Sequence, residues 1–361
     1  MARWEIILVL LSAIGSCLSS TDTTKPNEAN QKPHIVFILA DDLGWNDISW
    51  NNPLALSPNL EKLAREGVIL DQSYVQPICT PTRSALMTGR YPYTLGRQHG
   101  VIKPKVPTGV SIKRKLLPEA MKAAGYSTHI VGKWHLGFCS WDYTPTSRGF
   151  DTFWGYYTGS EDYYHHTRAG EEEECPEGLN GDGATTTEGY DFRNNTEVEY
   201  SVRGEYSTYA FTSYTVDLLE SRNPEEPMFL YLPFQSVHGP LQVPHNYTQP
   251  FAHVEDRDRR VKLGMVLALD EAVGTIVDAL KTSGHYNNTI IIFSTDNGGP
   301  VSVAGNNWPL RRKQGTLWEG VPWGLLSSTP LFSQGKGRFS RPYTRHRLVP
   351  HYCRLRRGRC S

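Results

Sequence analysis

Apolar positions along the chain form short continuous runs that alternate with longer segments of helical periodicity. Residues 34–40, HIVFILA, are apolar except at the first position and rich in β-branched side chains, which is typical of a strand buried on both faces. The runs STHIVG at 127–132 and MFLYLPF at 228–234 predict two further strands. The segment TIIIFSTDNGG at 289–299 predicts another strand that leads into a glycine-rich loop.

The segments between these runs predict helices. SPNLEKLAREG at 57–67 offers Ser57 as N-cap, then a proline, and ends at a glycine. KLLPEAMKAAGY at 115–126 also ends at a glycine, and residues 261–284 form a long amphipathic pattern. Because strands alternate with helices, the sequence predicts an α/β fold with a mostly parallel central sheet flanked by helices.

Three segments fall outside this alternation. Residues 160–205 are acidic, glycine-rich and without periodicity, and we interpret them as a surface insertion whose acidic run is solvated. Residues 321–361 hold nine Lys and Arg and no acidic residue, which predicts a basic tail after the main domain of residues 33–320. At the other end, Arg3, an apolar run and small residues predict a signal peptide over residues 1–20. No later run is long enough to span a membrane.

Composition narrows the class of protein further. Lys and Arg total 37, as do Asp and Glu, and this zero net charge argues against a nucleic-acid binder. Sequons at Asn194, Asn246 and Asn287 match the secretory pathway, and we expect a lysosomal or secreted glycoprotein. After loss of Cys17 with the signal peptide, an odd number of cysteines remains, so at least one is unpaired or modified. They are Cys79, Cys139, Cys175, Cys353 and Cys360.

Charged and polar side chains follow each predicted strand. They are Asp41 and Asp42, Lys133 and His135, His238, and Asp296 and Asn297. Ligands of open α/β sheets bind beyond the carboxyl ends of the strands, so we expect these side chains at one rim. The carboxylate and amide oxygens suit a hard cation such as Ca²⁺ or Mg²⁺, whereas zinc prefers histidine or cysteine. The positively charged Lys133 and Arg83, together with the two imidazoles, indicate a pocket for sulfate or phosphate.

Several dispersed motifs resemble those of the sulfatase family. CTPTR at 79–83, followed by TGR, is similar to the family's C-x-P-x-R signature, and GKWHLG at 132–137 is similar to its second signature. ADDLGWND at 40–47 and STDNGG at 294–299 resemble its metal-binding segments. The resemblance runs from about Pro33 to Gly320 and is strongest to the arylsulfatase B group.

The resemblance implies an alkaline phosphatase-like fold and hydrolysis of sulfate esters, either aryl sulfates or 4-sulfate groups of N-acetylgalactosamine in glycosaminoglycans. It implies that the formylglycine-generating enzyme converts Cys79 to formylglycine (3-oxoalanine). The hydrated aldehyde has two hydroxyls, one to attack sulfur and one to expel sulfate afterwards. One Ca²⁺ per chain would be bound by Asp41, Asp42, Asp296 and Asn297 together with an oxygen of residue 79.

The resemblance also assigns roles to the remaining side chains. Arg83 would hold the formylglycine oxygens, Lys133 the sulfate, His135 would act as base and His238 as acid. The family carries a sulfate-binding lysine five residues before a glutamate, where this chain has Gln314. We therefore keep Lys313, one position earlier, as a candidate for that contact.

A second departure begins after Gly320. We expect the family's next strand and helix, and its smaller C-terminal domain, to be missing, which predicts a less stable and weakly active chain. A truncated, non-catalytic sulfatase-like product therefore stays open as an alternative. A phosphoesterase of the same superfamily is a further alternative, but such enzymes use serine or threonine with two zinc ions, and the complete C-x-P-x-R argues against it.

Overall fold

The computed structural model describes residues 32–70, 73–169, 188–311, 314–315, 325–328 and 337–339. Within these residues, one ten-stranded sheet has the order β12-β2-β11-β10-β1-β9-β3-β4-β7-β8, and a separate two-stranded ribbon pairs β5 with β6. The middle strands are parallel: β10 (Thr289–Thr295), β1 (His34–Ala40), β9 (Met228–Pro233), β3 (Ser127–Lys133) and β4 (Thr152–Tyr156). The predicted α/β class and the four predicted strands are confirmed, while β4 escaped prediction.

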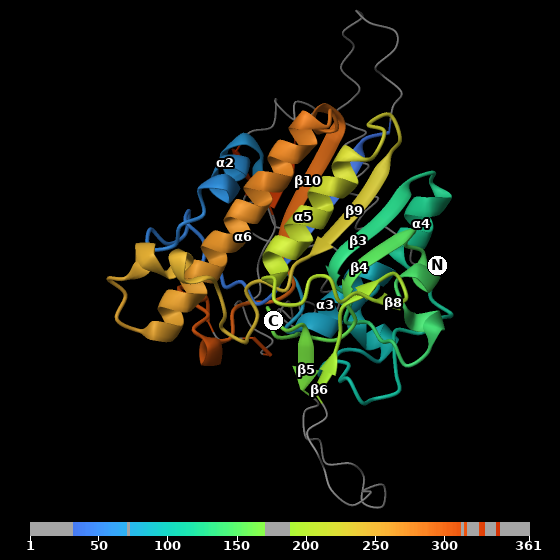
Figure 1. Ribbon diagram of the computed structural model, residues 1–361, viewed down its shortest axis with the longest axis horizontal. Helices are drawn as coiled ribbons and strands as arrows, with labels where there is room; N and C mark the ends of the chain where they lie inside the picture. The colour runs from blue at the N-terminus through green and yellow to red at the C-terminus, as the bar shows by residue number, and fades with distance from the viewer. Residues whose placement is uncertain are drawn as a thin grey trace, which may run out of the picture.

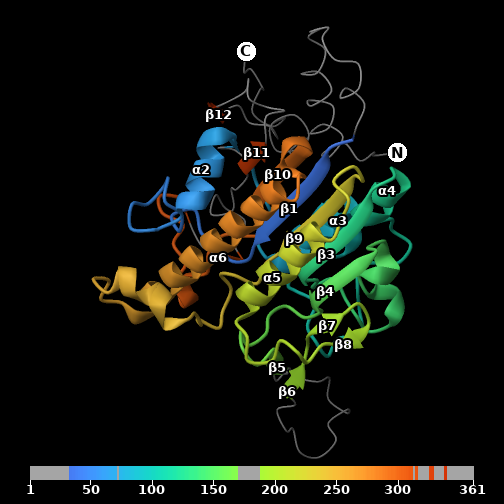
Figure 2. The ribbon, with the colours of Figure 1, turned by 45° about the horizontal axis from the view of Figure 1, so that its top comes forward.

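Helices cover both faces of the sheet (Figures 1 and 2). On one face lie α2 (Pro58–Glu66), α5 (Ser207–Glu220) and α6 (Arg257–Thr282), and on the other lie α3 (Cys79–Thr88) and α4 (Leu117–Ala123). Alternate side chains of β1 enter the two cores, because successive residues of a strand point to opposite faces. Val36 and Ile38 pack under α5 and α6, whereas Ile35 and Leu39 pack toward α3 and α4.

The N-terminus of α2 is held by a side chain of the neighbouring helix α6. Ser57 occupies the predicted N-cap position, but its hydroxyl bonds to Ser49 Oγ at 2.9 Å and does not cap the helix. The carboxylate of Asp270, on α6, accepts the backbone N–H groups of Leu60 at 2.8 Å and Asn59 at 3.1 Å. A side chain of the neighbouring helix therefore performs the capping that the sequence assigned to serine.

Shorter elements complete the described fold. The remaining strands are β2 (Val68–Leu70), β5 (Thr167–Ala169), β6 (Glu188–Tyr190), β7 (Arg193–Asn194), β8 (Glu197–Val198), β11 (Leu325–Ser328) and β12 (Gly337–Phe339). The 3-10 helices are η1 (Pro92–Leu95), η2 (Trp141–Tyr143), η3 (Thr146–Arg148), η4 (His245–Phe251), η5 (Tyr286–Asn288) and η6 (Val301–Val303). No helix of the described ranges combines the length and apolar character needed to cross a bilayer.

The predicted insertion at 160–205 is partly integrated into the fold. Its β7–β8 hairpin pairs antiparallel with β4 and extends the central sheet, and β5 and β6 form a ribbon. The hairpin strands are two residues long, too short for a period-2 pattern to appear in the sequence. The acidic run between β5 and β6 lies outside the described residues, as does the predicted signal peptide.

Two short strands come from the segment predicted to be a basic tail. β11 pairs antiparallel with β10 and with β2, and β12 pairs parallel with β2. We expected the family's next strand to be missing, and in the described residues β11 occupies the position beside β10. Backbone pairing with an open sheet edge requires no periodic side-chain pattern, so these two strands could not be predicted from periodicity.

Candidate functional site

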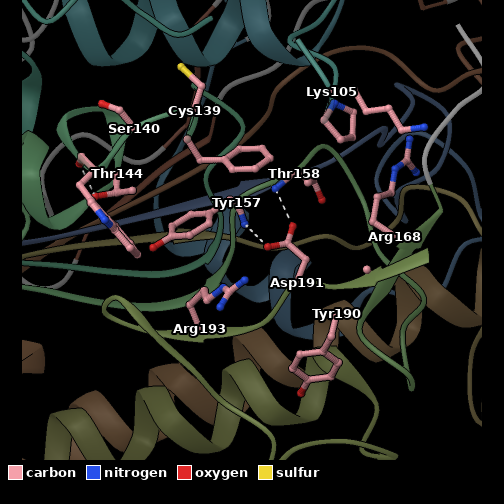
Figure 3. A pocket seen from close by; sticks show the side chains of 14 residues that line it. Lys105, Cys139, Ser140, Thr144, Tyr157, Thr158, Arg168, Tyr190, Asp191 and Arg193 are labelled. Carbon is pink, nitrogen blue, oxygen red and sulfur yellow. Dashed lines mark hydrogen bonds between the residues drawn. The ribbon is translucent and has the colours of Figure 1, made fainter. Parts of the chain in front are cut away.

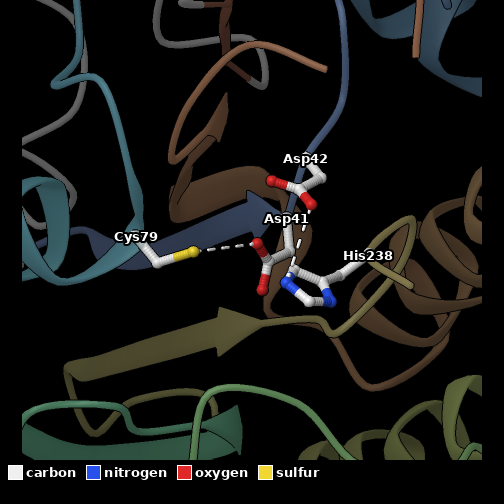
Figure 4. A group of neighbouring side chains, drawn as sticks. All are labelled: Asp41, Asp42, Cys79 and His238. Atoms are coloured by element: carbon white, nitrogen blue, oxygen red, sulfur yellow. Dashed lines mark hydrogen bonds and ion pairs between the residues drawn. The ribbon is translucent and has the colours of Figure 1, made fainter. Parts of the chain in front are cut away.

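The loops that leave the carboxyl ends of β1 and β9 meet the first residue of α3. Ligand atoms of Asp41, Asp42, Cys79 and His238 all lie within 4.8 Å of one another (Figure 4). The sequence predicted Asp41, Asp42 and Cys79 as metal-binding residues and His238 as a proton donor. The structure places all of them at the same rim of the sheet.

The sequence CTPTR forms the first turn of α3. Ile78, in extended conformation, precedes the helix, and Pro81 lies where a helix has no backbone acceptor for an N–H group, so the ring is tolerated. The Thr80 hydroxyl donates to the carbonyl of His135 at 3.4 Å, and the Thr82 hydroxyl donates to the carbonyl of Asp296. The two threonines therefore anchor Cys79 between the loops that follow β3 and β10.

Arg83 and Lys133 are buried cations held by carboxylates. Arg83 donates to Asp296 Oδ2 from Nε at 3.0 Å and from Nη2 at 2.8 Å, and its Nη2 lies 3.3 Å from Asp41 Oδ2. Lys133 Nζ donates to the same Asp41 oxygen. Burial opposes both charges, but the nearby carboxylates outweigh it and raise the pKa of each side chain. Two fixed positive charges therefore lie beneath Cys79.

The Cys79 thiol is neutral in this environment. It is 3% exposed and donates to Asp41 Oδ1 at 3.6 Å. Burial raises its pKa well above the usual value, and the carboxylates of Asp296 and Asp41 raise it further. The N-terminus of α3 and Lys133 favour a thiolate, but burial and the carboxylates outweigh them. The side chain is not poised to act as a thiolate nucleophile.

Polar groups from three loops converge on Asp42. Its Oδ1 accepts from Asn297 Nδ2 at 2.6 Å and from Gln314 Nε2 at 2.5 Å. Its Oδ2 lies 3.6 Å from His238 Nε2. Gln314 thus reaches the site at the position where the resemblance calls for a lysine, whereas Lys313 lies outside the described residues. Among the described residues, amide side chains donate to this carboxylate oxygen.

His135 is a buried, neutral imidazole with one unprotonated nitrogen. Its Nε2 donates to the carbonyl of Ile102 at 3.0 Å, which leaves Nδ1 as the unprotonated nitrogen of the ring. Nδ1 is buried and has no hydrogen-bond partner among the described residues. Burial lowers the pKa of His135 well below its usual value, and Lys133 and Arg83 lower it further. Its backbone has φ 55°, a left-handed conformation that is uncommon outside glycine and concentrates at functional sites.

The residues present fit a hard divalent cation. Asp41, Asp42 and Asp296 supply carboxylates, and Asn297 supplies an amide whose Oδ1 is buried without a hydrogen-bond partner in the part of the chain that the structure describes. An orphaned buried acceptor beside carboxylates is expected where a cation is absent. The two carboxylate oxygens of Asp296 have different neighbours. Oδ2 accepts from Arg83, while Oδ1 lies 3.4 Å from the backbone nitrogen of Asp42.

One residue of this site escaped prediction. Lys262, on α6, is fully buried and donates from Nζ to the carbonyls of Asp42 at 3.1 Å and Val237 at 2.6 Å. It therefore fixes the loops that carry Asp42 and His238. A lysine between the apolar positions of a long amphipathic helix was the available signal, since lysine is seldom buried without a specific partner.

The remaining sequence predictions concern modification. The three sequon asparagines, Asn194, Asn246 and Asn287, are all exposed. Cys139 is exposed and Cys79 is buried, and both are unpaired within the described ranges. Cys175, Cys353 and Cys360 lie outside those ranges.

The chain is similar to a known protein family and to several curated proteins. A family model described as Sulfatase matches residues 33–325. Arylsulfatase J of Mus musculus is 44% identical over 290 residues, which cover 80% of this chain and 46% of that protein. N-acetylgalactosamine-6-sulfatase of Mus musculus is 29% identical over 336 residues, covering 87% of this chain and 59% of that protein. The chain therefore spans about half the length of the curated relatives it matches.

The fold itself matches solved structures. A crystal structure described as Ps i-CgsB in complex with k-i-k-neocarrahexaose superposes with a TM-score of 0.76 and 32% sequence identity. The superposition covers 86% of this chain and 69% of that chain.

Proposed function

The chain belongs to the sulfatase family, and on that premise we propose that it hydrolyses sulfate esters of sugars and aryl alcohols at the cluster around Cys79. The observation that carries the proposal is the position of Cys79. It starts a helix whose threonines attach it to two strand-end loops, and its neutral thiol lies against Asp41 above two fixed cations. This environment suits a modified side chain better than a thiolate.

The proposal includes two groups that complete the site. We propose that the formylglycine-generating enzyme converts Cys79 to formylglycine, and that Asp41, Asp42, Asp296 and Asn297 hold one Ca²⁺ together with an oxygen of residue 79. When bound, the cation would polarise that oxygen, and the hydrated aldehyde would supply hydroxyl groups that cysteine lacks.

The chain's own residues would then divide the work. Lys133 and Arg83 carry fixed charges that offset the negative charge of a bound sulfate and of the transition state. His135 offers an unprotonated Nδ1 that can accept a proton. His238 is 25% exposed, and its Nδ1 donates to the carbonyl of Gly239 at 2.6 Å. Its Nε2 would donate a proton to a departing alcohol only from the doubly protonated ring, whose charge the Asp42 carboxylate 3.6 Å away would stabilise.

The substrate proposal is narrower than the family. Resemblance to the arylsulfatase B group favours 4-sulfate groups of N-acetylgalactosamine in glycosaminoglycans. Two similarities support a sulfated sugar in general, namely the relative called N-acetylgalactosamine-6-sulfatase and the structural neighbour solved with k-i-k-neocarrahexaose. We propose a lysosomal or secreted location, and the exposed sequon asparagines support passage through the secretory pathway.

A second candidate is a non-catalytic sulfatase-like protein that binds sulfated sugars. The observation that favours it is Gln314, a neutral side chain on Asp42 at the position where the resemblance calls for a sulfate-binding lysine. A missing cation would weaken sulfate binding and stabilisation of the transition state.

The test uses the chain co-expressed with a formylglycine-generating enzyme. Mass spectrometry of the Cys79 peptide should show an aldehyde in place of the thiol, and turnover of an aryl sulfate should exceed turnover of the matching aryl phosphate. Cys79→Ser should allow no steady turnover, because a sulfated serine has no second hydroxyl to release it. Full modification without turnover would favour the non-catalytic candidate, and steady turnover by Cys79→Ser would refute the formylglycine proposal.

A further inference from the structure

A cavity of about 640 Å³ is lined by residues other than those of the Cys79 cluster (Figure 3). Its volume is in the range of sites that bind small molecules, roughly 300 to 1,000 Å³. The lining side chains that matter here come from the segment between η1 and α4, from the loops after β3 and β4, and from the region of β5 to β7. They are Lys105, Phe138, Trp141, Tyr157, Arg168 and Arg193.

Residues that neighbour the cavity lining in sequence contact His135. Ile102, three residues before Lys105, accepts the hydrogen bond of His135 Nε2 at 3.0 Å, and its own N–H donates to Thr80, the neighbour of Cys79, at 3.1 Å. On the other side, Thr158 lines the cavity, and the next residue, Gly159, lies so close that an added Cβ would be 2.7 Å from His135 Cε1. A ligand in the cavity would therefore adjoin whatever occupies the Cys79 cluster.

The cavity is positively charged. Lys105, Arg168 and Arg193 line it, and Asp191 is the carboxylate among its lining residues. Asp191 is occupied, because its oxygens accept the backbone N–H groups of Tyr157 at 3.1 Å and Thr158 at 2.8 Å. Arg193 Nε is a buried donor with no hydrogen-bond partner in the described ranges. A buried unsatisfied donor beside further cations indicates a place for an anionic group.

Aromatic rings provide the second kind of contact. Tyr157 stacks on Phe138 with ring centroids 5.7 Å apart, and the Arg193 guanidinium lies 5.8 Å from the Tyr157 ring centre. Trp141 is 63% exposed, which leaves its ring available to a ligand. Rings of this kind offer a flat apolar surface, while the cations provide directed donors. A pyranose ring with an acidic substituent matches both features.

We propose that this cavity binds the sugar ring adjoining the sulfated sugar, and that this second ring carries an anionic group, either a carboxylate or a sulfate. The inference rests on the proposed function, since it places the cleaved ester at the Cys79 cluster. It makes the preferred substrate an acidic glycan segment of at least two rings, with Lys105, Arg168 and Arg193 contacting the second anion.

The test compares substrates that share the sulfated sugar. The first three substrates are an aryl sulfate, the sulfated sugar linked to a neutral hexose, and the sulfated sugar linked to a uronic acid. A fourth substrate carries a sulfated hexose in place of the uronic acid. Wild-type protein should prefer each anionic disaccharide over the neutral one by about ten-fold or more in kcat/KM, as one charge-assisted contact predicts. The anionic disaccharide with the larger kcat/KM relative to the neutral disaccharide identifies the second anion as a carboxylate or a sulfate.

Arg193→Gln and Lys105→Gln should each reduce this preference about ten-fold relative to the aryl sulfate rate, mainly through KM. Arg257→Gln is the matched control, because that arginine is 84% exposed at the start of α6 and should leave the preference unchanged. Lys105 is exposed, so its replacement also serves if Arg193→Gln does not fold. Equal kcat/KM for neutral and anionic disaccharides in wild-type protein would overturn the inference.

The two proposals fail in different ways. Absence of turnover on every sulfate ester by fully modified protein would refute the proposed function, and the cavity would then be judged by equilibrium binding of the disaccharides to Cys79→Ala protein. About ten-fold tighter binding of an anionic disaccharide, abolished by Lys105→Gln, supports the cavity. Binding that does not distinguish anionic from neutral disaccharides refutes it.

Discussion

His129 should make the folded protein sensitive to acid. It lies in β3 with 1% of its surface exposed, its Nδ1 bonds to Thr152 Oγ1 at 2.7 Å, and its Nε2 has no partner among the described residues. Burial, together with the charge of Arg222, lowers its pKa from 6.5 to about 4, although Asp151 acts in the opposite direction. The imidazole is therefore neutral in the folded state across most of the acidic range.

The sign and size of the effect follow from proton linkage. Between the two pKa values the unfolded chain binds a proton that the folded chain rejects, so stability is complete above the unfolded value and falls as the pH drops toward the folded one. The difference between the two pKa values corresponds to about 3 kcal/mol, of which about 2 kcal/mol would be lost by pH 5. A chain stable by about 5–15 kcal/mol would lose a sizeable part of its margin.

The assay is urea unfolding of wild type and His129→Asn at pH 7 and pH 5. Asparagine keeps a polar group near Nδ1 for Thr152 but cannot gain the proton. The variant is less stable at pH 7, yet its further loss on going to pH 5 should be smaller than that of wild type by about 2 kcal/mol. The control is His253→Asn, at an exposed position, which should lose as much stability between pH 7 and pH 5 as wild type. The same pH dependence in wild type and His129→Asn would refute the reasoning. The result bears on the proposed lysosomal location, because a lysosomal protein works at an acidic pH at which this loss of stability occurs.

Three further predictions address the site. Asp296→Asn should lower both calcium content and kcat by about a hundred-fold or more, because it removes the negative charge that would attract the cation and that pairs with Arg83. Unchanged metal content would contradict the assignment. Gln314→Lys should form an ion pair with Asp42 and strengthen inhibition by inorganic sulfate about ten-fold, as measured in initial-rate assays, and unchanged inhibition would count against a sulfate contact there. Gly159→Ala should lower kcat about ten-fold or more while leaving the melting temperature within a few degrees, because the new methyl displaces the His135 ring; unaltered kcat would show that the ring tolerates the shift.

The sequence predicted the middle of the fold well because buried parallel strands carry a strong signal. HIVFILA and TIIIFST became β1 and β10 at the predicted positions, and the rule that chemistry gathers at carboxyl strand ends brought the right loops together. The site residues were predicted from the motifs of the resembling family as much as from the strand ends.

The missed elements depend on tertiary contacts. α5, STYAFTSYTVDLLE, is rich in threonine and tyrosine, which are weak helix formers, and its helix is supported by packing such as Tyr214 stacked on Trp154 with centroids 4.6 Å apart. β11 is a strand because β10 offers an edge to pair with. The place of Lys262 among apolar helix positions indicates burial, but its partners, two carbonyls far away in sequence, are known only from the fold.

The depth of Cys79 has a consequence for how the protein is made. With 3% of the residue exposed and α3 bonded through Thr80 and Thr82 to two loops, no second enzyme can reach the thiol once the domain has closed. The proposed modification must then compete with folding on the time scale of synthesis. The fraction of active molecules would depend on the rate of modification relative to the rate of folding. A molecule that folds first stays without the modification for its lifetime. Conditions that slow folding should therefore raise specific activity, even though they leave the finished structure unchanged.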